Sequence, residues 1–177
     1  MRYVTNLYRD VPSYVYIGML VTFSLGIVIA ILLKGRRYSW QYIVGLLLAE
    51  YVMLIFCSTV VYRKISESVK FDYTPFWSYK AIQGGREDIL LESIMNVIAF
   101  VPVGVLLWLL FRSRKLWQAL AVGMGISVMV EMLQYVLKRG FVEFDDVFHN
   151  TLGCLIGIMI VALLRGIWLL QKRYLTS

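Results

Sequence analysis

Seven side chains that are candidates for chemistry fall within twenty residues of an otherwise apolar sequence. They are Glu131, Gln134, Arg139, Asp145, Asp146, His149 and Asn150. Carboxylates and histidine can transfer protons, arginine can bind a carboxylate or a phosphate through two hydrogen bonds, and amides can both donate and accept. Because burying such groups among apolar residues costs free energy, they must either pair with one another or serve a function.

Three of these side chains share one side of an expected helix. Asp146, His149 and Asn150 are spaced i, i+3 and i+4, which places them on neighbouring positions of a helix surface. Asp145 and Asp146 fall in the first turn, where a carboxylate caps the helix or interacts favourably with its positive end. Either aspartate therefore has a purely structural alternative, as an N-cap.

Glu131 carries the strongest functional signal. It lies several residues inside an apolar run, with Gln134 on nearly the same helix face, and Arg139 is the nearest cation able to hold a carboxylate. A carboxyl group at that depth is protonated, paired with a cation, or required for function. Gln134 and Asn150 have a structural alternative, because amides inside membranes commonly form hydrogen bonds between helices.

The same residues supply the catalytic and metal-binding candidates. Glu131 or Asp146 could act as a general base, with His149 as an acid, but no serine-centred nucleophile elbow, phosphate-binding loop or histidine pair accompanies them. His149 and Asp146, together with Asp145 and Glu131, are weak metal-ligand candidates, since a single histidine without HExxH-type spacing is a poor signal. We predict neither a metal nor a cofactor.

Composition identifies the class of protein that must position these residues. Of 177 residues, 60% are hydrophobic and 16% are charged, the mean hydropathy is +0.72, and soluble domains carry about 25% charged residues. Unbroken apolar runs favour helices over a membrane barrel, whose strands alternate in polarity. We expect an all-α polytopic membrane bundle of about five transmembrane helices. The expected spans are Tyr14–Leu33, Trp40–Tyr62, Ile94–Phe111, Leu116–Leu137 and Val147–Leu164.

The charges between the spans predict an orientation. Connectors 34–37 and 112–115, with the end of the chain from Arg165, hold nine basic residues and no acid. The segments that alternate with them, including the long connector 63–93, hold nine basic and nine acidic residues. By the positive-inside rule the acid-free set faces the cytoplasm, so the N-terminus is outside and the C-terminus inside. The net charge of +7 then needs no nucleic-acid partner.

In this orientation the polar side chains come to one depth. Asn96, at the outer end of the third span, joins Glu131 and Gln134 in the fourth and the polar group that begins the fifth. Spans three to five are therefore expected to build a polar pocket in the outer leaflet. Glu50 lies apart from it, in the inner half of the second span, with no evident partner.

Features around this pocket also carry expectations. The aromatic part of connector 63–93 is either an interfacial or re-entrant segment or an ordinary loop with an aromatic belt, and the acidic stretch to Glu92 begins a helix. Gly153 and Gly157 form a small-residue face for close helix packing. Pro102 is expected to kink the third span near the polar cluster.

Four motifs in order resemble the VanZ-like family of small bacterial membrane proteins. They are Pro75-Phe76, the run NVIAFVPVG at 96–104, Glu131-x-x-Gln134, and Arg139 followed by EFDD at 143–146 and NTLG at 150–153. The resemblance covers about residues 63 to 157 and suggests an N-terminal two-span segment (1–62), a VanZ-like domain (63–170) and a cytoplasmic tail (171–177). Asp72, where asparagine is expected, and His149, where an apolar residue is expected, depart from the pattern.

The resemblance implies a cell-envelope role in the bacterial cytoplasmic (inner) membrane, because the founding member of the family is associated with lower susceptibility to teicoplanin. We favour a binding module that holds a membrane lipid headgroup or a lipid-linked wall precursor. Its candidate binding residues are Asn96, Glu131, Gln134, Arg139, Asp145, Asp146 and Asn150. Two alternatives stay open: an enzyme acting on a lipid-linked phosphate or glycan, and a polar cluster that only fastens helices together.

Overall fold

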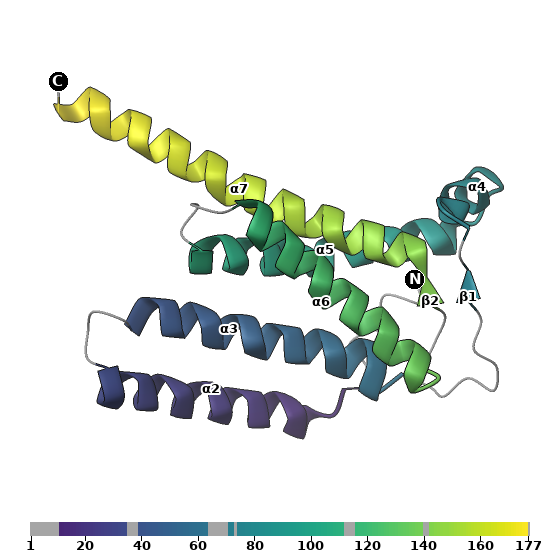
Figure 1. Ribbon diagram of the computed structural model, residues 1–177, viewed down its shortest axis with the longest axis horizontal. Helices are drawn as coiled ribbons and strands as arrows, with labels where there is room; N and C mark the ends of the chain where they lie inside the picture. The colour runs from purple at the N-terminus through teal and green to yellow at the C-terminus, as the bar shows by residue number, and fades with distance from the viewer. Residues whose placement is uncertain are drawn as a thin grey trace.

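The protein is a bundle of long helices (Figure 1). The computed structural model describes residues 11–34, 39–63, 71–72, 74–111, 116–139 and 142–176. The long helices are α2 (Ser13–Lys34), α3 (Ser39–Phe56), α5 (Glu87–Phe111), α6 (Leu116–Val136) and α7 (Phe144–Thr176). Four segments are long and apolar enough to cross a membrane, and Ser13–Ile29 of α2 is a shorter apolar helix. The expected multi-pass helical membrane protein is confirmed.

The long helices alternate in direction, so each end of the bundle holds the C-termini of some helices and the N-termini of others. α3 and α6 finish, and α5 and α7 begin, at the end that also carries the short elements (Figure 1). The basic connectors predicted to face the cytoplasm join helix ends at the opposite end of the bundle. Residues 35–38 and 112–115 of these connectors lie outside the described residues. The side of the membrane that each end faces stays a prediction.

Glycines let α5 and α7 pack backbone to backbone, and this pair makes the most extensive contact in the bundle. A Cβ atom added at Gly104, Gly153 or Gly157 would overlap a backbone carbonyl oxygen of the opposite helix. A Cβ at Gly123 of α6 would likewise overlap the sulfur of Cys154. The predicted small-residue face of Gly153 and Gly157 is therefore in contact with α5. Cys154 is buried and unbridged, as expected of a small apolar filler.

α2 packs chiefly on α3, at the flank of the bundle (Figure 1). Between these helices, the Thr22 hydroxyl donates a 2.6 Å hydrogen bond to a carboxylate oxygen of Glu50. Glu50, which has no evident partner in the sequence, is thus held by a hydroxyl of the first helix. The pairing is the kind of interhelical polar contact by which membrane helices associate.

Several short elements close the end of the bundle where α5 and α7 begin. A five-residue π-helix, η1 (Cys57–Val61), continues α3, and a short helix α4 (Trp77–Gln83) precedes α5. Strand β1 (Phe71–Asp72) pairs in parallel with β2 (Val142–Glu143), directly before α7. The connector 63–93 is therefore tied to the start of α7 by backbone pairing.

α6 ends in a hydrogen-bonded reversal. Lys138 has φ = 54°, its amide donates to Tyr135 O, and the amide of Arg139 donates to Gln134 O. These two bonds with a left-handed residue between them form a Schellman motif, in which glycine is the usual left-handed residue. The reversal turns Arg139 back toward the end of α3.

Two helices are longer than the apolar runs predicted. α5 begins at Glu87, with Glu87 and Asp88 in its first turn, so the acidic stretch does begin this helix. α7 runs 33 residues to Thr176, which corresponds to roughly 50 Å at about 1.5 Å per residue. Residues 171–176 of the predicted cytoplasmic tail are helical and continue α7, and Ser177 lies outside the described residues. The cytoplasmic location of this segment stays a prediction.

Candidate functional site

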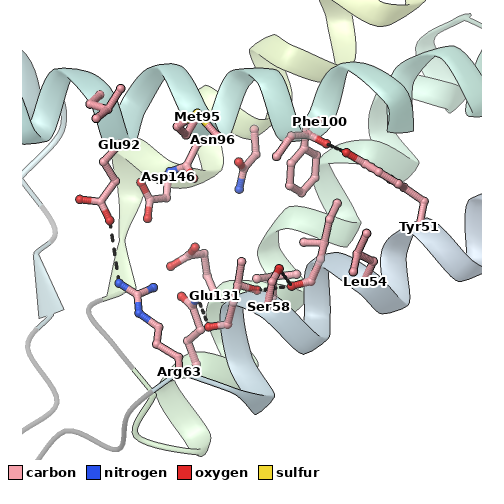
Figure 2. A pocket seen from close by; sticks show the side chains of 17 residues that line it. Tyr51, Leu54, Ser58, Arg63, Glu92, Met95, Asn96, Phe100, Glu131 and Asp146 are labelled. Carbon is pink, nitrogen blue, oxygen red and sulfur yellow. Dashed lines mark hydrogen bonds and ion pairs between the residues drawn. The ribbon is translucent and has the colours of Figure 1, made fainter. Parts of the chain in front are cut away.

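A polar cavity of about 60 Å³ lies at the end of the bundle where α5 and α7 begin. Side chains from α3 and η1, α5, α6 and α7 line it, together with Arg63 just after η1. Five of the residues predicted to form a pocket are in this lining: Asn96, Glu131, Gln134, Asp146 and Asn150. Figure 2 shows the carboxylates of Glu131 and Asp146 turned toward the same space as Arg63.

The two carboxylates deepest in the cavity each have one described donor. Asp146 accepts a 2.7 Å hydrogen bond at Oδ1 from the Asn96 side-chain amide. Glu131, only 5% exposed, accepts at Oε2 from the backbone amide of Glu143 across 3.4 Å, beyond the usual length of such bonds. Within the described part of the chain, Glu131 Oε1 and Asp146 Oδ2 have no donor.

The two amides of the cavity each use their nitrogen to join helices. Gln134 donates from Nε2 to the carbonyl of Thr59 in η1 at 3.2 Å, and Asn150 donates from Nδ2 to Ser127 Oγ of α6 at 2.9 Å. These bonds match the structural alternative given for both amides. Their oxygens, Gln134 Oε1 and Asn150 Oδ1, are buried without a hydrogen-bond partner among the described residues, an arrangement that is uncommon and costly.

The π-helix supplies one of these acceptors. Ser58 and Thr59 both donate their hydroxyl hydrogens to Ile55 O, at 2.9 and 2.7 Å, while the carbonyl of Thr59 receives the Gln134 amide. Single-turn π-helices interrupt regular helix bonding and occur often at functional sites. Nearby, Tyr51 of α3 donates to Ala99 O of α5 at 3.0 Å, one turn before Pro102; the predicted kink at that proline stays a prediction.

The cation of the cavity, Arg63, was not among the residues predicted to bind. Arg63 lines it, and its Nη2 lies 3.8 Å from Glu92 Oε1, which lines it too (Figure 2). Both side chains are about one-third exposed, at 34% and 37%, so the pair lies at the rim. The only available signal was position, because Arg63 is the first charge after the second span and Glu92 comes shortly before the third.

Asp145 lies outside the cavity lining and serves another element. Its carboxylate accepts hydrogen bonds from the backbone amides of Phe76, at 2.7 Å, and Ser78, at 2.9 Å, and from the Ser78 hydroxyl. Phe76 is the N-cap of α4 and has φ = 60°. Asp145 is therefore a helix cap, as its structural alternative proposed, but it caps α4 rather than its own helix. The VanZ-like Pro75-Phe76 motif is thereby joined to the aspartates of α7.

Arg139 also lies outside the lining, and it forms an ion pair with neither Glu131 nor Asp145, the two carboxylates closest to it in the predicted arrangement. Its Nη1 donates to the carbonyls of Val61 and Arg63, at 2.7 and 2.6 Å. Among the described residues no carboxylate lies within ion-pair distance of it. Arg139 holds the chain where η1 ends and so positions the backbone of Arg63 at the cavity rim.

His149 faces α4 rather than the cavity. Its Nε2 lies 3.3 Å from the Tyr79 hydroxyl, and its ring lies 5.8 Å from the rings of both Tyr79 and Phe148. The i, i+3, i+4 spacing therefore brings Asp146 and Asn150 into the lining but leaves His149 out. Within the described ranges, no group of three or more His, Cys, Asp or Glu side chains is arranged to hold a metal ion.

Comparison with known proteins covers most of the bundle. A family model described as VanZ/LLP1 matches residues 40–165, from α3 into α7. Protein VanZ from Enterococcus faecium is 32% identical over 72 residues, a match covering 41% of this chain and 45% of that protein. The chain thus spans less than half the length of this relative. No solved structure matches the chain.

Proposed function

This chain belongs to the VanZ/LLP1 family, and from that premise we propose that it is a cell-envelope protein whose cavity binds the polar end of a membrane lipid or of a lipid-linked wall precursor. The observation that carries the proposal is Glu131. This carboxyl group is buried among four helices, and its described donor lies 3.4 Å away. An ionisable group kept inside a membrane protein without a close partner is by default a functional group.

The proposal places the cavity in the outer leaflet of the bacterial cytoplasmic membrane. Its support is the distribution of charge: the acid-free basic segments belong to the opposite end of the bundle from the cavity, and such segments face the cytoplasm. The outer leaflet is where glycopeptide antibiotics can reach lipid-linked wall precursors. Membership of the family supports the further proposal that an occupied cavity alters susceptibility to teicoplanin-type glycopeptides.

The size of the cavity limits what enters it. A void of about 60 Å³ has room for a few water molecules, since one water needs roughly 10–15 Å³. Pockets for drug-sized ligands measure about 300–1,000 Å³. Only a small polar group fits, so the acyl or polyprenyl chain of the ligand would stay in the surrounding lipid. This favours binding of a headgroup over enclosure of a whole precursor.

The geometry supports binding more than catalysis. An enzyme using Glu131 or Asp146 as base and His149 as acid would need these groups around one substrate, but His149 lies against Tyr79 and outside the lining. The cavity carboxylates are thus left without the acid that the sequence suggested. Catalysis is therefore kept as one possible outcome of the experiment described next.

The test is to incubate the purified protein with phospholipids and polyprenyl-phosphate lipids and to measure retained lipid by native mass spectrometry and products by chromatography. We expect lipid to be retained without turnover, and Glu131→Gln to lower retention while abundance and elution profile stay normal. Glu50→Gln is the matched control, because Glu50 is an intramembrane carboxyl outside the cavity. Lipid turnover that is abolished by Glu131→Gln would instead establish an enzyme. A loss of protein abundance in proportion to the loss of lipid retention would establish that the polar cluster is structural.

A further inference from the structure

We propose that the cavity receives a primary ammonium group of its ligand, while Arg63 at the rim holds the anionic group next to that ammonium. The inference rests on the proposed function and names the chemistry of the headgroup. It follows from an imbalance between hydrogen-bond donors and acceptors, and between negative and positive charges, among the residues of the lining.

The lining offers acceptors without donors. Glu131 Oε1 and Asp146 Oδ2 have no described donor, and the oxygens of Gln134 and Asn150 are buried and unpartnered in the described structure. Gln134 is 2% exposed and Asn150 is 4% exposed, so bulk water does not serve them. These four oxygens come from α6 and α7, on two sides of the same cavity.

Each neutral donor group described in the lining makes at least one hydrogen bond to the protein. The hydroxyls of Tyr51, Ser58 and Thr59 donate to backbone carbonyls. The amides of Asn96, Gln134 and Asn150 each use one of their two N–H groups, bonding to Asp146, Thr59 O and Ser127 respectively. The unpartnered oxygens of the cavity therefore favour a group that brings N–H donors and no acceptor of its own.

The charges show the same imbalance. Glu92, Glu131 and Asp146 line the cavity, and Arg63 is the cation in its described lining. Arg63 and Glu92 are at the exposed rim, and among the described residues no cation lies within ion-pair distance of Glu131 or Asp146. Because a buried carboxylate is costly unless it is paired, a positive group is the occupant that this pair of carboxylates favours. A phosphate in the same place would meet like charge.

A primary ammonium meets both requirements. It carries three donors, no acceptor and one positive charge. A sugar hydroxyl would add further lone pairs to an acceptor-rich site, and a quaternary ammonium has no N–H to donate. The guanidinium of Arg63 at the rim can bind the phosphate of the same headgroup through charge-assisted bonds, so a zwitterionic headgroup of the ethanolamine-phosphate type fits the arrangement.

The test measures retention of three phospholipids with identical acyl chains by delipidated protein, using native mass spectrometry. Phosphatidylethanolamine presents N–H donors, phosphatidylcholine has a methylated ammonium, and phosphatidylglycerol has no ammonium. Because hydrogen bonds to charged groups are among the stronger ones in proteins, we expect phosphatidylethanolamine to be retained about tenfold or more over the other two. Glu131→Gln and Asp146→Asn should each reduce that preference, and Glu50→Gln should keep it.

Competition with soluble glycerophosphoethanolamine distinguishes binding of a free headgroup from binding of an intact lipid. Competition by it at millimolar concentration shows that the headgroup suffices, and no competition shows that the ligand must be a lipid. Equal retention of phosphatidylglycerol and phosphatidylethanolamine, with both lost in Arg63→Gln, would overturn the ammonium assignment while leaving lipid binding intact. Retention of no lipid by the wild-type protein would overturn lipid binding as well. The lipid series needs no variant, so its result stands even where a substitution impairs folding.

Discussion

Asp145 and Ser78 lie 67 positions apart in the sequence, and the Asp145 carboxylate accepts hydrogen bonds from both the backbone amide and the hydroxyl of Ser78. A third bond, from the amide of Phe76, completes the contact. The first turn of α7 therefore holds α4 in place, and the ring of Phe76 lies 5.4 Å from that of Phe148. Asp145 therefore anchors α4, and with it the connector that leads into α5, to the start of α7.

Replacing Asp145 with alanine should destabilise the protein. Asp145 is 1% exposed, and its removal leaves the part-buried amide of Phe76 and the buried amide and hydroxyl of Ser78 without this acceptor. Hydrogen bonds to charged groups contribute about 1.5–3 kcal/mol each, so we expect a loss of about 3 kcal/mol. Thermal unfolding in detergent and proteolysis near α4 would measure it. Asp88→Ala is the control, because Asp88 pairs with Arg86 at an exposed surface; equal effects of the two substitutions would contradict the capping role.

Gly153→Ala should separate α5 from α7. Its Cβ would overlap the carbonyl oxygen of Val97, and overpacking of this kind costs about 1–3 kcal/mol. Gly166→Ala is the matched control in the same helix, since nothing lies within 4 Å of its added Cβ; it should be neutral or stabilising by up to about 1 kcal/mol. Melting temperatures of the two purified variants in one detergent decide the matter, and a neutral Gly153→Ala would refute the close contact.

Thr22→Val should weaken the docking of α2. Valine matches threonine in shape but cannot donate to Glu50, so a 2.6 Å hydrogen bond between α2 and α3 is lost. Such bonds in membranes contribute about 0.6 kcal/mol on average and up to about 1.7 kcal/mol. A lower melting temperature, restored in the double variant Thr22→Val with Glu50→Leu, is expected. Ser24→Ala should have little effect, because Ser24 donates only within its own helix, to Leu20 O.

Cysteine labelling should establish the orientation. Lys80 is an exposed residue of α4, and Tyr174 is 82% exposed near the end of α7. With a membrane-impermeant thiol reagent on intact cells, Lys80→Cys should react at once. Tyr174→Cys should react only after the cells are permeabilised. The wild-type protein measures the background from Cys57 and Cys154, and the reverse labelling pattern would invert the proposed topology.

The sequence predicted the membrane bundle because lipid permits few ways of satisfying a backbone, and long apolar runs then become helices. The extent of α7 was underestimated. Apolar character weakens at Arg165, but leucine, glutamine, lysine and arginine are all good helix formers, so the helix continues to Thr176. Hydropathy predicts which residues lie in the hydrocarbon region of the membrane. Backbone hydrogen bonding and helix propensity determine where the helix ends.

The members of the cavity were partly predictable for the same reason. Asn96, Glu131 and Asp146 come to one depth through span length alone. Neighbouring residues on a helix point about 100° apart, so Asp145 turns to α4 while Asp146 turns to the cavity, and a spacing rule does not say which aspartate faces which partner.

Arg63 and Arg139 were harder to place. Arg63 stands in a connector without periodicity. The path of Arg139 depends on the left-handed conformation of Lys138, a position where glycine would have been the sequence signal.

The glycine contacts between α5 and α7 decide how the cavity can change its volume. Helices whose backbones touch at Gly104, Gly153 and Gly157 cannot move closer, and they cannot slide without forcing Cα atoms into carbonyl oxygens. Asn96 and Asp146 therefore stand on a fixed wall. On the opposite wall, side-chain bonds from Gln134 to Thr59 O and from Arg139 to Val61 O join η1 to the end of α6. Under the proposed function, this is the wall that would part to admit a headgroup from the lipid.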